Sequence, residues 1–80
     1  MTIYELTLTE KAMEEAPGMW DMNLKHVIIA DSRVRARMIA GEARRDEPRD
    51  WWRENDYSTL RAIGYAPKAE KAYIVCTQTG

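Results

Sequence analysis

Apolar and polar residues alternate at the start of the chain. In the stretch TIYELTLT, the larger apolar residues Tyr4, Leu6 and Leu8 stand at every second position, which is the pattern of a strand with one buried face. The stretch that follows, EKAMEEAPGMWDMN, loses this period and contains Pro17 and Gly18, a turn signal. We therefore expect a first strand followed by a long connection.

A second strand and a helix are predicted next. The run HVIIA is short and rich in β-branched residues, and it ends at Asp31 and Ser32, whose side-chain oxygens are good caps for the start of a helix. The helix is expected to run from Ser32 to about Arg45. Four of its small or apolar residues fall at i, i+3, i+4 and i+7, so they share the face that should pack on a sheet: Ala36, Ile39, Ala40 and Ala43.

Two further strands complete the expected fold. STLRAIGYA and KAYIVCT both have the composition of strands, and the short PKAE between them fits a hairpin connection. The order strand, strand, helix, strand, strand predicts an α+β fold, in which one main helix packs on one face of an antiparallel sheet of three to four strands. One helix cannot cover both faces, so the other face should be solvated, shielded by the first connection or used for binding.

The chain has the size and composition of one globular domain, residues 1–80. It is 45% hydrophobic and 31% charged, which argues against disorder. One cysteine excludes an internal disulfide and fits a reducing compartment, and no apolar run approaches the ~20 residues that span a membrane. The N-terminal sequence lacks the features of a secretion signal. We expect a cytoplasmic protein with no membrane association.

Positive charge is concentrated in residues 25–45, whose net charge is +4 although the whole chain carries −1. On the expected helix, Val34, Met38 and Gly41 lie nearly opposite the core face, with arginines around them. A solvated helix face is one interpretation, but Arg and Met are also enriched in interfaces. The candidate partner-binding residues on this helix are Arg33, Arg35, Arg37, Met38, Arg44 and Arg45.

Two adjacent tryptophans stand in the charged connection RDEPRDWWREND, where Pro48 can begin a short second helix. Successive side chains diverge in any regular backbone, so both rings should not point inward. We predict that Trp51 plugs the end of the core. Trp52 is the candidate partner contact, because exposed Trp is often an interface hot spot.

The sequence offers no support for catalysis. His26, the only histidine, has no cysteine or carboxylate at metal-ligand spacing, and it is expected to be structural or exposed. Cys76 lies in an apolar strand, where a thiol usually behaves as a small buried hydrophobic group. Glycine-rich phosphate loops and nucleophile elbows are absent from the sequence. We expect no enzyme activity, no metal site and no cofactor.

Four stretches between roughly residues 26 and 76 form a further pattern: HVIIADS, RARMIAGEA, a Trp-bearing loop and LRAIGYA. The residues that carry it are Ala30, Ser32, Ala36, Ile39, Ala40, Trp51, Ile63, Gly64 and Ala66. This pattern resembles a set of small bacteriophage-encoded proteins that includes anti-CRISPR proteins acting on type I systems. The resemblance implies a non-enzymatic, cytoplasmic binder in the host bacterial cell that captures a type I surveillance complex (Cascade) and blocks target DNA binding.

Two contact modes stay open at this point. The arginine-rich helix, with Trp52 and Met38 as apolar anchors, is able to grip an acidic protein surface. Alternatively, an acidic surface is able to imitate DNA phosphates; its candidate residues are Glu10, Glu14, Glu15 and Asp21. Competing functions are a small nucleic-acid-binding phage accessory protein that uses the same helix, and a self-associating phage assembly component. We expect a monomer.

Overall fold

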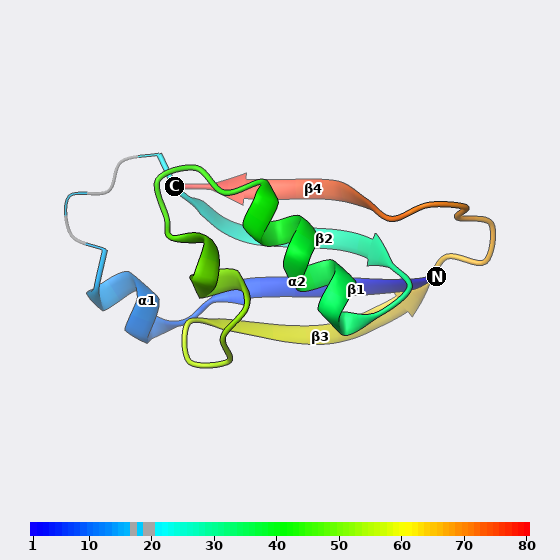
Figure 1. The fold of residues 1–80 in the computed structure, drawn as a ribbon, viewed down its shortest axis with the longest axis horizontal. Coiled ribbons are helices and arrows are strands. Elements are labelled where there is room, and N and C mark those ends of the chain that lie inside the picture. Colours follow the sequence, from blue (N-terminus) through cyan, green and yellow to red (C-terminus); the bar gives the residue numbers. More distant parts are fainter. Residues whose placement is uncertain (17, 19–20) are drawn as a thin grey trace.

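The structure, a computed structural model, describes residues 1–16, 18 and 21–80. It confirms the α+β class, with a single antiparallel sheet and one main helix packed on it (Figure 1). The elements in chain order are β1 (Thr2–Leu8), α1 (Glu10–Glu14), β2 (Asn23–Ala30), α2 (Arg33–Glu42), the 3-10 helix η1 (Arg49–Trp52), β3 (Ser58–Tyr65) and β4 (Tyr73–Thr79).

Strands β3 and β4 flank a central antiparallel pair formed by β1 and β2. The four strands lie in the order β3-β1-β2-β4, and every neighbouring pair is antiparallel. The prediction that PKAE closes a β3–β4 hairpin is therefore wrong, because these strands form opposite edges. Residues 66–72 instead cross the end of the sheet (Figure 1). Three strand spacings amount to about 14 Å, which seven residues bridge without strain.

The helices differ from the expected ones at their ends. The first connection contains α1, because the Thr9 side chain accepts a hydrogen bond from the Ala12 amide and caps this single turn. The predicted turn at Pro17 lies outside the described residues. Ser32 caps α2 as predicted, but α2 ends at Glu42 rather than Arg45. Pro48 precedes η1 in extended conformation.

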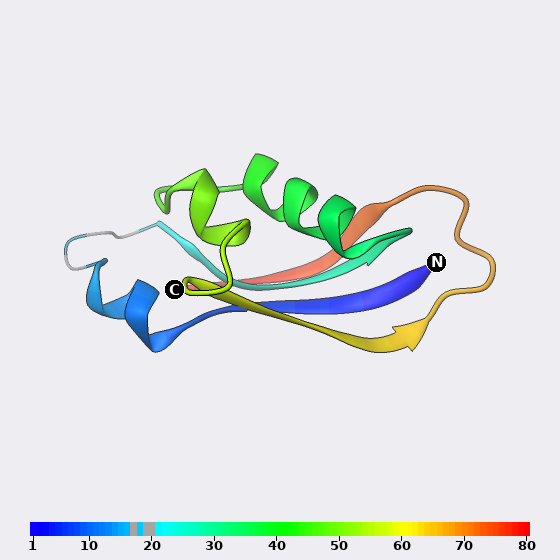
Figure 2. The same ribbon diagram turned by 60° about the horizontal axis from the view of Figure 1, so that its bottom comes forward.

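The core lies between α2, η1 and one face of the sheet (Figure 2). Ala36 and Ala40 of the predicted helix face are completely buried, and such small side chains let α2 approach the strands closely. Gly41, predicted on the outer face, is buried as well. A Cβ at this position would lie 3.0 Å from Arg49 Cγ, because η1 packs against that side of α2.

Trp52 is fully buried, so its assignment as an exposed partner contact is wrong. Its ring packs beside His26, with ring centroids 4.7 Å apart. Trp51, the predicted plug, is also buried, and it stacks on Tyr57 at 5.3 Å. The two rings do diverge, as a 3-10 turn requires, but separate neighbours cover them. Two adjacent rings that point in different directions are therefore both buried here, each against its own neighbour.

The other face of the sheet carries no helix among the described residues (Figure 2). Register places Gly64, Ile3, Ile29 and Tyr73 in one row across all four strands of this open face. Cys76 lies opposite Val27 on the same face. It is exposed rather than buried as predicted, because β4 is an edge strand and nothing described covers this side.

We expect Trp52→Ala to lower the free energy of unfolding by about 4 kcal/mol, the usual cost of deleting a buried aromatic ring. Val34→Ala, a truncation at a position that is 71% exposed, should change it by less than about 0.5 kcal/mol. Urea unfolding followed by circular dichroism measures both. Equal effects of the two substitutions would contradict the placement of Trp52.

Candidate functional site

Two adjoining grooves run along the side of α2 that faces η1 and β3. The larger has a volume of about 540 Å³ and the smaller about 410 Å³. Val34 and Arg37 line both, so we treat the two as one feature, the α2 groove. The larger part is completed by Arg33, Asn55, Ser58, Thr59 and Leu60, and the smaller by Met38 and Arg53.

Arg37 lines both parts of the α2 groove and links α2 to η1 and β3. Its Nη1 donates to the Trp52 carbonyl at 2.9 Å and to Ser58 Oγ at 2.8 Å. Its Nη2 donates to Asn55 Oδ1 at 2.8 Å and, more weakly, to the Ser58 carbonyl at 3.4 Å. All of these acceptors are neutral, so the hydrogen bonds hold the guanidinium in place without compensating its charge.

These bonds change the role that the sequence suggested for Arg37. A guanidinium has five N–H groups, and the four on its Nη atoms are engaged within the protein. Only Nε–H is left, so Arg37 cannot offer a two-pronged contact to a partner. Burial, followed by the neighbouring charge of Arg33, lowers the pKa of Arg37 from its ordinary value. It acts as a fixed positive charge.

The other two arginines of the α2 groove, Arg33 and Arg53, are exposed and keep their N–H donors free. No carboxylate of the described residues lies within 4 Å of either guanidinium. Three positive charges therefore surround Val34 and Met38, which are 71% and 36% exposed. The arrangement suits an anionic group with apolar surface beside it.

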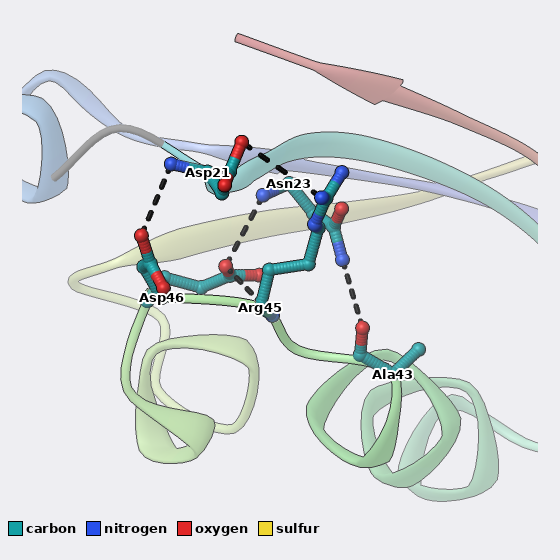
Figure 3. Close-up of polar contacts among 6 residues, drawn as sticks. Asp21, Asn23, Ala43, Arg45 and Asp46 are labelled. Carbon is teal, nitrogen blue, oxygen red and sulfur yellow. Dashed lines mark hydrogen bonds and ion pairs between the residues drawn. The ribbon is translucent and has the colours of Figure 1, made fainter.

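The remaining arginines of the predicted surface lie elsewhere. Arg35 and Arg44 are exposed but line neither part of the α2 groove. Arg45 lies beyond the end of α2, where its Nη2 is 3.8 Å from Asp21 Oδ1 (Figure 3). Arg45 and Asp21, assigned to two alternative binding surfaces, thus compensate each other. The structure brings together only Arg33, Arg37 and Met38 of the predicted set.

The predicted acidic surface is likewise divided. Glu10 and Glu14 lie one turn apart on α1 and are exposed. The neighbouring carboxylate of Glu15 raises the pKa of Tyr57, so Glu15 interacts with Tyr57 within the chain. Since Asp21 is paired with Arg45, no single face presents all four carboxylates unpaired.

Sequence reasoning missed the residue that positions the α2 groove, Glu47. Although ionisable, it is only 1% exposed. Its Oε1 accepts from the amides of Asn23 and Arg45, each at 3.1 Å, and its Oε2 accepts from Trp52 Nε1 at 2.9 Å. Trp52 in turn offers its carbonyl to Arg37. Glu47 is one of five acidic residues in RDEPRDWWREND, and nothing in the sequence distinguishes it from the exposed ones.

Further bonds close the same corner (Figure 3). Asn23 Nδ2 donates to the Ala43 carbonyl at 2.9 Å, and the Asp46 amide donates to the Asp21 carbonyl at 2.8 Å. The Asp21 amide returns a bond to Asp46 Oδ2 at 3.1 Å. The segment after α2 is therefore fixed to the start of β2, and this fixes where η1 packs.

His26 is buried behind Trp52. Of the two roles predicted for it, structural or exposed, the structural one is therefore correct. Its Nδ1 lies 2.8 Å from Thr77 Oγ1, while Nε2 has no hydrogen-bond partner among the described residues. Burial lowers the pKa of His26, and the nearby Glu47 opposes this in part. His26 supports the core and does not line the α2 groove.

Across residues 1–16, 18 and 21–80, no group of three His, Cys, Asp or Glu side chains has the geometry of a metal site. None of the helices in this part of the chain is long and apolar enough to cross a membrane. Comparisons with protein-family models, curated proteins and solved structures found no match.

We expect Arg37→Ala to destabilise the fold by about 2 kcal/mol, because it removes hydrogen bonds from a charged donor that link α2 to η1 and β3. Arg33→Ala is the matched control on the same groove and should change stability by less than about 0.5 kcal/mol. Chemical denaturation measures both. If the two variants are equally stable, the hydrogen bonds of Arg37 contribute no net stability.

The lowered pKa of His26 predicts an acid-sensitive fold. The unfolded chain binds a proton near the ordinary pKa of 6.5, whereas the folded protein does so only at lower pH. Stability is therefore retained above about pH 6.5 and declines as the pH falls from there towards the folded pKa. Urea midpoints between pH 5 and 8 test this, with His26→Gln as the control. An equal decline in this variant would assign the effect to other groups.

Proposed function

We propose that the chain is a non-enzymatic binding protein that inhibits the surveillance complex of a type I CRISPR system. The observation that carries a binding role is the α2 groove, where Arg33 and Arg53 have no carboxylate beside them and Val34 is exposed. The choice of target rests on the sequence resemblance described above.

Inhibition in this proposal is steric. The α2 groove docks on an acidic surface of the complex, and the rest of the protein, with extents of 40 × 20 × 16 Å, obstructs the path of target DNA. Desolvated arginines next to apolar side chains are typical of interface hot spots. The charge of the groove also favours approach to an acidic surface.

The test is a pull-down of a purified type I surveillance complex by the tagged protein, followed by a DNA gel shift of the captured complex. We expect capture and loss of DNA binding with the wild type. The double variant Arg33→Glu/Arg53→Glu should weaken capture by roughly tenfold or more. Arg35→Glu/Arg44→Glu makes the same charge change outside the groove and should weaken it less than about threefold.

The second candidate is a nucleic-acid-binding accessory protein, which the same uncompensated arginines favour. If Arg33, Arg37 and Arg53 contact phosphates, affinity for duplex DNA should fall linearly with log salt, with a slope of about −3. A protein interface with an apolar anchor depends less on salt. Failure to capture the complex, together with salt-sensitive DNA binding, would replace the first proposal by this one.

A further inference from the structure

Resting on the proposed function, we infer that the α2 groove receives a partner segment in which one apolar side chain lies between two carboxylates. The two parts of the groove share Val34 and Arg37, and each adds one further arginine.

The apolar position is set by Val34. This side chain lines both parts of the α2 groove and is 71% exposed, the highest exposure among the large apolar side chains of α2. Met38, one turn further along α2, continues the apolar strip into the smaller part. Together they offer a surface that an aliphatic side chain covers and that a phosphodiester backbone leaves in contact with water.

The two acidic positions are set by arginines on either side of this strip. Arg33 lines only the larger part of the groove and Arg53 only the smaller part. Neither has a hydrogen bond or ion pair from its guanidinium within the described residues, so each is able to grip a carboxylate through two N–H groups. One acidic group therefore fits each part.

Arg37 lines both parts of the α2 groove. Because the hydrogens on its Nη atoms are bound within the protein, its charge cannot move away from Arg33 when the groove is empty. Two neighbouring guanidiniums with no anion between them repel each other, and a bound carboxylate removes that repulsion. The groove is thus preorganised for negative charge, which lowers the cost of binding.

Nuclear magnetic resonance titration of the labelled full chain tests this with a capped Glu-Leu-Glu tripeptide. We expect shifts of the Val34 methyl groups and of the Arg33 and Arg53 Nε–H signals. Glu-Gly-Glu lacks the apolar group and Gln-Leu-Gln lacks the charges, so each should bind at least threefold more weakly. No saturable shift of these signals with Glu-Leu-Glu, or equal binding of all three peptides, would overturn the inference.

A single-stranded thymidine decamer distinguishes the other source of anions. If it shifts the same signals at lower concentration than Glu-Leu-Glu, the groove recognises phosphates and the inference is wrong. Val34→Ser changes an exposed side chain and should reduce Glu-Leu-Glu binding with the fold intact. Arg35→Glu on the far flank of α2 is the charge control and should leave the peptide shifts in place.

Failure of the inference is separable from failure of the proposed function. Capture of the surveillance complex that survives Val34→Ser/Arg33→Glu/Arg53→Glu would place the interface elsewhere, which overturns the inference and leaves the function standing. Peptide binding that meets the expectations above, without capture of the complex, would support the chemistry of the groove and refute the proposed target.

Discussion

A carboxylate that is withdrawn from water holds the helical layer of this protein to its sheet. Glu47 accepts hydrogen bonds from the amides of Asn23 and Arg45 and from the indole of Trp52. An unpaired carboxylate in this position would carry a large desolvation cost. The three donors offset that cost only in one arrangement of the chain, so the same bonds that make Glu47 tolerable specify where η1 lies.

The α2 groove depends on this arrangement indirectly, through Trp52. With its ring fixed by Glu47 and His26, Trp52 presents its backbone carbonyl to Arg37. Trp52 thus contributes to the candidate surface through its main chain rather than its indole. The packing behind Arg37 offsets the free-energy cost of holding its charge without a counter-ion, as expected where a binding site is built on a rigid frame.

The sequence was informative where periodicity and caps decide the structure. Alternation located β1, Ser32 located the start of α2, and small residues located its buried face. The edge positions of β3 and β4 depend on long-range pairing, which has no local signal. Burial of Glu47 and Trp52 was hidden for the same reason, since their neighbours in the chain are charged and exposed. For the candidate site, the sequence predicted the types of residue. Which of them come together, namely Arg33, Arg37 and Met38, depends on where η1 packs.

Charge compensation separates the α2 groove from the open face of the sheet. On the open sheet face, Glu5 lies between Arg61 and Lys25, at 3.0 and 3.6 Å, so each of these two cations has a carboxylate beside it within the chain. Ile29 on that face is 7% exposed, whereas its neighbour Tyr73 on the edge strand β4 is 47% exposed. The open face gains little charge complementarity from a partner. The α2 groove combines exposed apolar surface with uncompensated charge, and a partner that supplies an apolar side chain between carboxylates relieves both.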